Sequence, residues 1–541
     1  MHAAQTCNLA RLLSHTARLW PQRTALIHGD ALTPTRWTWA QIDARVDALV
    51  AGLRALGLKK GDRILLQSRN NLAMFESGWA AFRMGCVWVP TNFRLAPGEV
   101  AYLGASSGAV AMLVEPLFAG HAEAVRAASP ALQQVVWIGD APAGELSYEG
   151  LIAQHRGAAP AEAVVAHDDP LWFFYTSGTT GKPKAAVLTH GQMAFVVTNH
   201  LADLIPGTTE QDVSIALAPL SHGAGIHALL NVARGAATVL LPSEKMDPAL
   251  VWLLIERHRV SNLFTVPTIV KLLVEHPAVD QHDHSSLRFM VYAGAPMYRA
   301  DQRLALQKLG PVLVQYFGLG EVTGCITVLP AHMHSAIDAD PNAHVGACGL
   351  PRTGMEVAVL DEQMNPRAVG EIGEICVRGP AVFAGYHDNP EATARALRGG
   401  WFHTGDLGTL DARGLLSITG RESDMYISGG SNVYPREAEE VLLTHPGVAE
   451  VAVLGVPDRQ WGEVGVAVVV RRVGGDAHAD ADAVSAEALL AFLDGRLARY
   501  RWPRRIFFWD ALPKSGYGKI TKNEVRALLF DRGEVQRVNA D

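Results

Sequence analysis

The sequence predicts a two-domain protein: a large α/β domain with mixed, largely parallel sheets and flanking helices, followed by a small α+β domain. Three observations lead to this prediction. Short β-rich runs alternate with helical stretches up to about residue 420, the pattern changes after that residue, and 49% of the 541 residues are apolar, which is enough for large cores. We place the large domain at residues 1–420 and the small domain at residues 421–541.

The elements of the large domain follow from their hydrophobic patterns. The first 20 residues favour an amphipathic helix that buries Leu9, Leu12 and Leu13. The runs DRILLQ, AAVLTH, ATVLLP and LRFMVYAG are short and rich in apolar residues, so each predicts a strand. The runs ALVWLLIERH and TIVKLLVEH have the periodicity of helices. Strands that alternate with helices in this way favour parallel pairing.

The small domain is predicted from four runs that follow one another closely. PREAEEVLLTHPGVAEVAVLGVPD predicts a helix, a turn and a strand, and EVGVAVVVRR predicts a second strand. SAEALLAFLDGRLARY predicts an amphipathic helix, and RRIFFW a further strand. The polar, glycine-rich stretch GRESDMYISGG is expected to link the two domains, and the low-complexity residues 474–483 are not expected to carry chemistry.

Composition excludes several classes of protein. The formal net charge of −7 argues against general nucleic-acid binding, which needs a basic face. The five cysteines are widely spaced and form no C-x-x-C pair, which argues against a disulfide framework or a zinc site and favours a reducing, cytoplasmic compartment. We expect no signal peptide and, because the apolar runs are interrupted well short of about 18 residues, no transmembrane segment.

The stretch YTSGTTGKPKAAVLTH, residues 175–190, has the chemistry of a phosphate-binding loop. Its glycines allow backbone N–H groups to converge on an anion, its hydroxyl groups add donors, and Lys184 adds a positive charge. It is not a Walker A loop, because only two residues separate Gly178 from Gly181 and a proline follows Lys182. The residues expected to bind phosphate are Thr176, Ser177, Gly178, Thr179, Thr180, Gly181 and Lys184.

This motif resembles the phosphate loop of the adenylate-forming superfamily, which includes acyl- and aryl-CoA synthetases, adenylation domains of peptide synthetases and beetle luciferases. Further motifs resemble that family in order along the chain: PLSHGAG, YAGAPM, QYFGLGEVTG, WFHTGDLG, GRESDMYISGG and LPKSGYGKI. The resemblance implies a large ATP- and acid-binding domain and a small mobile domain. It also implies that the carboxylic acid reacts with ATP to give acyl-AMP and pyrophosphate, and that coenzyme A then displaces AMP.

The resemblance assigns roles to individual residues. It implies that Lys519, Glu321 and His222 are catalytic, that Glu321 binds Mg²⁺, and that Asp424 is the hinge between the domains. The residues implied to bind adenine and ribose are Gly294, Ala295, Pro296, Gln315, Phe317, Gly318, Asp406 and Arg421. The residues implied to contact CoA are Ser428, Gly429 and Gly430. The sequence departs from the family at Gly320, where a threonine is usual, and at Ser423, where many CoA ligases have lysine.

The identity of the acid is less clear from the sequence. The pocket residues implied by the resemblance are His222, Gly223, Gly225, Val266 and Gly294. Small residues after His222 are expected to leave room for a bulky or long acyl group, and no arginine in these segments would pair with a second carboxylate. We therefore expect a hydrophobic monocarboxylic acid, and prefer a medium- or long-chain fatty acid to an aryl acid of the benzoate or cinnamate type.

Other functions share the same motifs. An adenylation enzyme would load a carrier protein instead of CoA, a luciferase-like oxygenase would consume the adenylate, and a nucleotide sensor would bind ATP without catalysis. Retention of Lys519, Glu321 and Asp406 argues against the sensor, and the ISGG segment favours CoA. The sequence does not indicate the oligomeric state, and a homodimer is suggested by family analogy alone.

Overall fold

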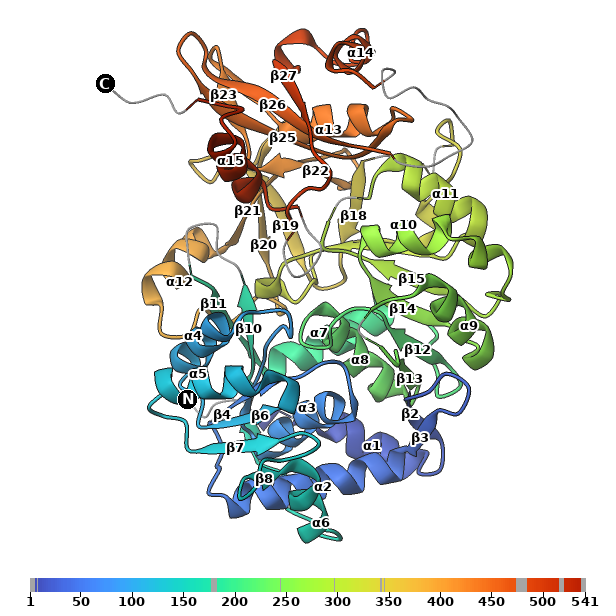
Figure 1. The fold of residues 1–541 in the computed structure, drawn as a ribbon, viewed down its shortest axis with the longest axis vertical. Coiled ribbons are helices and arrows are strands. Elements are labelled where there is room, and N and C mark those ends of the chain that lie inside the picture. Colours follow the sequence, from blue (N-terminus) through green and yellow to red (C-terminus); the bar gives the residue numbers. More distant parts are fainter. Residues whose placement is uncertain are drawn as a thin grey trace. The chain divides into compact units, whose positions relative to one another are not determined.

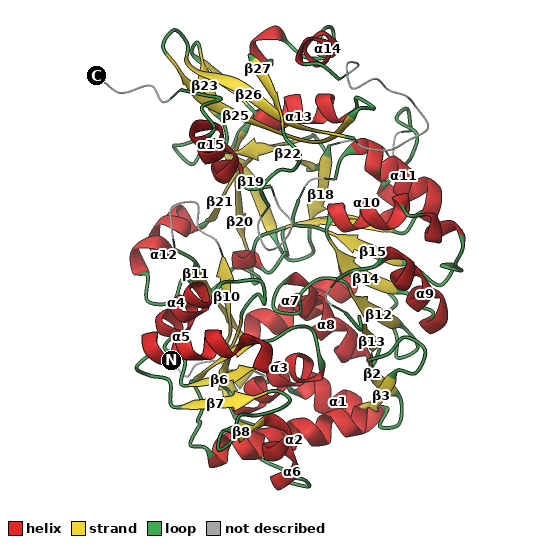
Figure 2. Ribbon diagram, viewed as in Figure 1, coloured by secondary structure: helices red, strands yellow, loops and turns green. Residues whose placement is uncertain are grey.

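The structure is a computed structural model, and it describes residues 5–6, 8–176, 182–243, 245–295, 297–340, 343–344, 346–472, 484–514 and 520–536. Its residues form two compact units (Figures 1 and 2). Unit 1 comprises residues 1–294, 303–357 and 377–402. Unit 2 comprises residues 295–302, 358–376 and 403–541. Each unit is therefore built from segments that are separated in the sequence.

A seven-stranded sheet lies in unit 1, with the strand order β11-β10-β5-β4-β6-β7-β8. All its pairings are parallel except the hairpin of β10 and β11. Its strands are β4 (Arg63–Gln67), β5 (Val87–Pro90), β6 (Ala111–Val114), β7 (Gln134–Trp137), β8 (Leu146–Ser147), β10 (Pro170–Thr176) and β11 (Lys184–Thr189). The helices between them are α3 (Leu72–Met84), α4 (Pro97–Ser107), α5 (Ala119–Ala128) and α6 (Tyr148–Gln154). A parallel sheet with helical crossovers is what the alternating sequence pattern predicts.

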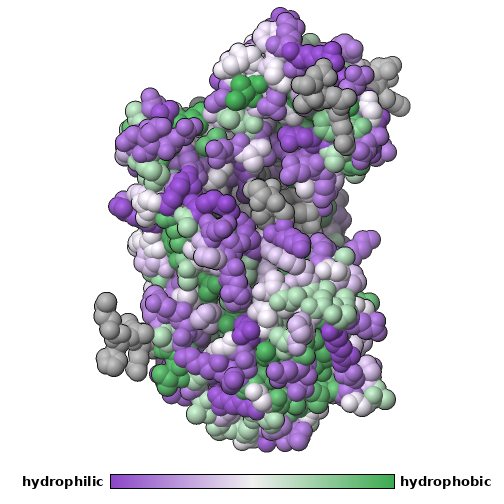
Figure 3. Space-filling view, turned by 90° about the vertical axis from the view of Figure 1, so that its left-hand side faces the viewer, coloured by the Kyte–Doolittle hydropathy of each residue, from purple (hydrophilic) through white to green (hydrophobic). Residues whose placement is uncertain are grey.

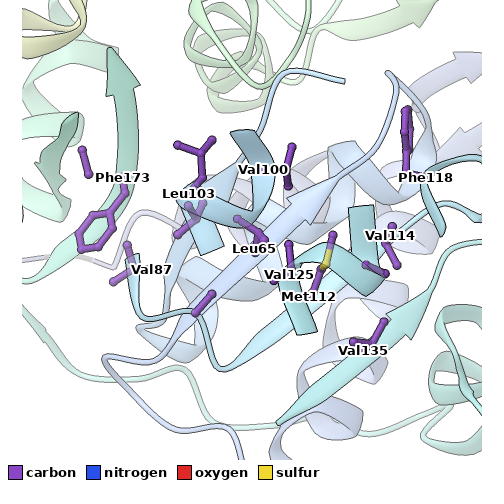
Figure 4. Close-up of a cluster of buried hydrophobic side chains, with 14 of the residues drawn as sticks. Leu65, Val87, Val100, Leu103, Met112, Val114, Phe118, Val125, Val135 and Phe173 are labelled. Carbon is purple, nitrogen blue, oxygen red and sulfur yellow. The ribbon is translucent and has the colours of Figure 1, made fainter. Parts of the chain in front are cut away.

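Both faces of this sheet are covered by helices. On one face, Val100 and Leu103 of α4 and Val125 of α5 pack on Leu65 and Met112 of the strands (Figure 4). The residue next to Leu65 in the sequence, Ile64, is also buried, because successive strand residues point to opposite faces and both faces are covered. This burial explains why these strands are apolar runs and not alternating ones.

A second sheet in unit 1 positions several of the residues predicted to bind adenine and the acid. Its order is β18-β17-β16-β15-β14-β12-β13-β2-β3, and it is parallel from β2 through β16. Its strands are β2 (Thr24–His28), β3 (Thr35–Thr38), β12 (Val213–Ala216), β13 (Ala237–Leu240), β14 (Asn262–Thr265), β15 (Phe289–Tyr292), β16 (Leu313–Phe317), β17 (Thr327–Leu329) and β18 (Ala347–Pro351). The helices between or beside them are α1 (Arg11–Leu19), α2 (Trp39–Ala55), α7 (His190–Asp203), α8 (Gly223–Arg234), α9 (Pro248–His258) and α10 (Pro267–Glu275). Unit 1 also contains the short helix α12 (Pro390–Ala396).

Unit 2 contains two groups of strands. The first has the order β19-β20-β21-β22, and the second has the order β24-β23-β26-β25, with β27 paired to β26. The strands are β19 (Glu356–Leu360), β20 (Gly373–Arg378), β21 (Phe402–Leu410), β22 (Leu416–Arg421), β23 (Tyr426–Ser428), β24 (Ser431–Val433), β25 (Val448–Asp458), β26 (Gly462–Arg471) and β27 (Arg505–Phe508). The helices are α13 (Pro435–Leu443), α14 (Ala486–Phe492) and α15 (Lys522–Asp531), which cover the sheet of β25 and β26 with two apolar clusters.

The predicted fold class is confirmed, and two local predictions differ from the structure. The helix expected over residues 485–500 ends at Phe492, because Gly495 adopts a positive φ of 69° soon after it. The stretch expected to link the domains contains the end of β22 and the whole of β23. Among the described residues, no helix combines the length and apolar character needed to cross a bilayer. Hydrophilic and hydrophobic residues are interspersed over the face shown in Figure 3.

Candidate functional site

The hairpin of β10 and β11 presents the two ends of the predicted phosphate loop. Thr176, the last residue of β10, pairs with Lys184, the first residue of β11. The Nζ atom of Lys184 lies 4.6 Å from the centre of the Tyr386 ring. Five of the loop residues between these strands, Ser177, Gly178, Thr179, Thr180 and Gly181, lie outside the described residues. The hairpin therefore holds a hydroxyl group and a cation side by side at the base of the loop.

Glu321 is buried beside this hairpin and receives two hydroxyl donors. Thr176 Oγ1 donates to its Oε1 atom at 2.9 Å, and Tyr386 Oη donates to the same atom at 2.8 Å. No described residue hydrogen-bonds Oε2. Burial, together with the neighbouring Glu321 carboxylate, raises the pKa of Tyr386, so that this phenol stays a donor at physiological pH. The carboxylate is thus oriented by one oxygen, while the other is available to a ligand.

Gly320 is enclosed by the side chains of two strand residues. A β-carbon at this position would lie 2.6 Å from Cδ1 of Phe174 and 2.8 Å from Cγ2 of Thr176, closer than real side chains approach. The ring of Phe174 also packs on His222, with centroids 4.3 Å apart. The missing threonine of the family motif is therefore accompanied by an aromatic ring that fills its space and contacts the predicted acid-site histidine.

His222 precedes α8, and the first turn of that helix is tightly packed. A β-carbon at Gly223 would lie 2.9 Å from the Phe264 ring, and one at Gly225 would lie 2.0 Å from the Leu220 carbonyl oxygen. Packing within unit 1 therefore requires both glycines. Their small size does not by itself create the room for an acyl group that the sequence analysis expected.

The remaining predicted residues of unit 1 lie at the ends of neighbouring strands. Gly294 follows β15 with a φ of 84°, Val266 precedes α10, and Phe317 ends β16, and all three are partly or fully exposed. Gln315, two residues before Phe317, accepts a hydrogen bond from the Tyr292 hydroxyl at 3.0 Å. Gly318 follows directly. Because β14, β15 and β16 are parallel neighbours, these residues lie together at the carboxyl ends of the strands, where ligands of α/β proteins usually bind.

Unit 2 holds Asp406, which is buried and lies in β21. Arg421 pairs with Asp406 from the neighbouring strand β22, and its Nε donates to Asp406 Oδ1 at 3.1 Å. The segment of β21 before Asp406 is fixed by Glu374, whose Oε1 accepts from the Gly405 N–H at 3.2 Å and whose Oε2 lies 2.6 Å from His403 Nδ1. Both oxygens of Glu374 are thus used to hold the segment that carries Asp406.

Glu374 and His403 also belong to a group with metal-binding potential. With Cys376 they offer ligand atoms that all lie within 4.8 Å of one another. Their mutual hydrogen bonds already account for this closeness, since Cys376 Sγ lies 3.5 Å from His403 Nδ1. We therefore interpret the group as support for the part of β21 that precedes Asp406.

The predicted hinge and CoA segment also lie in unit 2. The N–H of Asp424 donates to the Arg421 carbonyl in a turn between β22 and β23. Gly429 and Gly430 connect Ser428 of β23 to β24 with φ values of 57° and 82°, which is the conformation of a tight two-residue hairpin turn. Ala295 lies in unit 2 as well. Pro296 and Lys519 lie outside the described residues.

Sequence reasoning missed three residues of this geometry. Tyr386 hydrogen-bonds the predicted residue Glu321, Glu374 hydrogen-bonds Gly405 next to Asp406, and Phe174 fills the space at Gly320. Tyr386 and Glu374 lie 65 and 31 residues from the residues that they bond, so no spacing rule connects them. Phe174 sits in the apolar run before the loop, but nothing in that run distinguishes it from a core residue.

Comparison with known proteins identifies the class to which this fold and site belong. The sequence profile of the AMP-binding enzyme family matches residues 13–387, and that of the AMP-binding enzyme C-terminal domain matches residues 437–519. The chain therefore belongs to the AMP-binding enzyme family, as the motifs predict. It is an adenylate-forming enzyme of the acyl-CoA synthetase class.

Three relatives illustrate the similarity. A feruloyl-CoA synthase of Amycolatopsis sp is 39% identical over 514 residues, covering 94% of this chain and 96% of the relative. The long-chain-fatty-acid–CoA ligase FadD13 of Mycobacterium tuberculosis is 33% identical, covering 96% of this chain and 98% of the relative. The crystal structure of the anthranilate CoA ligase AuaEII in complex with anthranoyl-AMP is 25% identical, with a TM-score of 0.86, and covers 98% of both chains.

Proposed function

We propose that this protein is an ATP-dependent ligase that joins an aromatic monocarboxylic acid to coenzyme A. A carboxylate oxygen attacks the α-phosphorus of ATP, the bond to the β-phosphate breaks, and acyl-AMP and pyrophosphate form. The thiol sulfur of CoA then attacks the acyl carbon, the bond to the AMP oxygen breaks, and the thiol proton is lost to solvent. The products are acyl-CoA and AMP.

The observation that carries the choice of an aromatic acid is the lining around His222. The ring of Phe174 packs on His222, and Phe264, which contacts Gly223, stacks on Tyr316 with an interplanar angle of 19°. Flat rings favour a flat substrate, because aromatic pairs gain about 0.5–1.5 kcal/mol beyond their buried area. This proposal departs from the fatty acid that the sequence favoured, and it is supported by relatives named for ferulate and anthranilate.

The first step needs donors and cations where negative charge develops. We assign the phosphate contacts to the loop between Thr176 and Lys184. The donor set at Glu321 fits a Mg²⁺ ion, because a carboxylate oxygen is a preferred ligand and Oε2 has no described partner. A bound Mg²⁺ would neutralise phosphate charge. Lys519 is assigned to the acyl and phosphate oxygens, from the sequence motif alone.

The second step needs access for a thiol in place of Lys519. We propose that residues 421–541 form a small domain that turns about Asp424 after acyl-AMP has formed. The hairpin turn of Gly429 and Gly430 leaves these residues exposed, as contact with the pantetheine arm of CoA requires. A two-state hinge separates two chemical steps that need different groups at one position.

The experiment is a panel of acids assayed in two stages. Pyrophosphate release is measured with acid and ATP, and loss of free CoA thiol is measured after CoA is added. We expect benzoate- and cinnamate-type acids to support both stages with a higher kcat/KM than octanoate or palmitate. Faster turnover of the fatty acids would contradict the aromatic assignment. Pyrophosphate release without thiol loss would favour loading of a carrier protein, and neither activity would favour a sensor.

A further inference from the structure

A small cavity lies between α8 and the second sheet of unit 1, next to the residues that follow His222. Its volume is about 10 Å³, which is room for one water-sized group such as a hydroxyl. It is lined by Ser214, Ile215, Ala216, Leu220, Ala224, His227, Ala228, Thr238 and Phe264. Phe264 contacts both this cavity and Gly223, so the cavity adjoins the start of α8. His227 lies five residues after His222, a rise of about 7.5 Å along a helix, which is a distance that an extended aryl-propenoate spans.

The side chain of His227 is held in one tautomer by a buried chain of amides. Asn231 Nδ2 donates to the His227 carbonyl at 2.9 Å, which leaves Asn231 Oδ1 to accept from Asn262 Nδ2 at 3.1 Å. Asn262 Oδ1 then faces His227 Nε2 at 2.8 Å. Because that oxygen only accepts, Nε2 carries the proton, and Nδ1 is an acceptor. Burial lowers the pKa of His227 to about 4, so the ring stays neutral at pH 7.

Two polar atoms of the cavity-lining residues have no partner among the described residues. One is His227 Nδ1, and the other is the hydroxyl Oγ1 of Thr238 on β13. Both side chains are buried, with exposed fractions of 5% and 2%. Buried polar atoms without a partner are rare in proteins, because each costs about 1–3 kcal/mol. Their presence on one cavity indicates a ligand group that completes them.

We propose that this cavity receives a hydroxyl group at the far end of the acid, so that the substrate is a hydroxylated aromatic acid. The inference rests on the proposed ligase function and specifies its substrate. A hydroxyl satisfies both partners at once, since its O–H donates to His227 Nδ1 while its oxygen accepts from the Thr238 hydroxyl. An ether oxygen only accepts, a second carboxylate only accepts, and the terminal methyl group of a fatty acid does neither.

Three acids with the same cinnamate skeleton and different para substituents test the proposal: 4-hydroxycinnamate, 4-methoxycinnamate and cinnamate. In the unmodified protein, we expect kcat/KM for AMP formation with CoA to be about tenfold or more higher for the hydroxylated acid than for cinnamate, because a site built to bind a hydroxyl discriminates against its absence. The methoxy acid should be no better than cinnamate, since its methyl group replaces the donated hydrogen.

Variants connect this discrimination to the two side chains. Thr238→Val removes an unpartnered hydroxyl from a nearly isosteric residue, and His227→Phe removes the acceptor. Each should reduce the tenfold preference to less than about threefold, mainly by lowering kcat/KM for the hydroxylated acid. The matched control is Thr265→Val, which removes another buried, unpartnered hydroxyl that does not line the cavity, and it should leave the preference unchanged. Thermal unfolding of each variant reports whether it folds, and Thr238→Val remains informative if His227→Phe does not.

The outcomes separate the inference from the function on which it rests. Equal use of cinnamate and 4-hydroxycinnamate by the unmodified protein would overturn the hydroxyl site while leaving the aryl-CoA ligase intact, and so would an unchanged preference in Thr238→Val. If the cavity holds only an ordered water, we expect these same two results: equal use of both acids and no effect of Thr238→Val on the preference. Absence of AMP formation with every acid, ATP and CoA would overturn the proposed function itself.

Discussion

The ring of Phe174 occupies the space into which a side chain at Gly320 would project, since a β-carbon there would lie 2.6 Å from Phe174 Cδ1. The two residues come from β10 and from the turn after β16, and they pack beside Thr176 and Glu321. Gly320 has no positive φ, so the constraint is steric and does not come from the backbone conformation. The glycine at position 320, which departs from the family motif, is thus matched by the large side chain of Phe174 that fills its space.

This pair predicts that Gly320→Thr alone lowers the stability and activity of the protein, and that a smaller residue in place of Phe174 restores them. Overpacking a filled site costs about 1–3 kcal/mol, and it would also displace His222 through the Phe174 ring. We expect Gly320→Thr to lower the urea midpoint of unfolding and to reduce pyrophosphate release by more than tenfold. The double variant Gly320→Thr/Phe174→Ala should lose less stability than the two single variants lose together. Additive losses would show that the two residues are not coupled.

A second prediction concerns the two hydroxyl donors at Glu321. Tyr386→Phe removes one hydrogen bond but keeps the ring beneath Lys184. Because a hydrogen bond to a charged group contributes about 1.5–3 kcal/mol, we expect pyrophosphate release to fall by about tenfold to a hundredfold and the Mg²⁺ concentration for half-maximal rate to rise. Glu321→Gln should cause a larger loss. An unchanged Mg²⁺ dependence in both variants would contradict the assignment of Glu321 as the magnesium ligand.

A third prediction follows from the support of Asp406 by Glu374. Asp406→Ala should raise KM for ATP by about tenfold to a hundredfold, because a hydrogen-bonded carboxylate is lost from the predicted ribose contact. Glu374→Ala removes the hydrogen bonds to Gly405 and His403 in β21, so it should raise KM for ATP by a smaller factor. KM for ATP in the double variant should be little higher than in Asp406→Ala, since both substitutions act through Asp406. A change in KM for the acid instead would contradict this assignment.

The limits of sequence reasoning in this protein are physical. The α/β class was predictable because strands buried on both faces are apolar runs and the helices between them are periodic. Residues of contiguous motifs were predictable as well, and Thr176 and Glu321 do lie in hydrogen-bond contact. The partners Tyr386, Glu374 and Phe174 were not, because side-chain contacts between distant segments follow from sheet order, which the sequence does not state. The His227 tautomer depends on the amides of Asn231 and Asn262, and their contact is visible only in three dimensions.

A fourth prediction separates the two half-reactions and rests on the C-terminal motif. Lys519→Ala should reduce pyrophosphate release by about a hundred- to a thousandfold, as expected when one group that stabilises transition-state charge is removed. Thioester formation from synthetic acyl-AMP and CoA should stay within about threefold of the unmodified rate. Lys514→Ala is the matched control, because that lysine forms an ion pair with Glu450 and has no assigned role in catalysis. Equal losses in both half-reactions would argue against alternation about Asp424.

The last prediction is a loss of stability in mild acid that arises from buried histidines. Burial lowers the pKa of His190 and of His227 to about 4, against an ordinary value of 6.5. Between these values the unfolded chain binds protons that the folded protein does not, so the free energy of unfolding is highest above pH 6.5 and decreases as the pH falls towards 4. Each histidine contributes up to about 1.4 kcal/mol per pH unit in this window. Urea unfolding at pH 7, 6 and 5 measures the slope, and His190→Gln should make it shallower by about one such contribution. A slope that is the same with and without His190 would mean that this histidine is protonated in the folded protein.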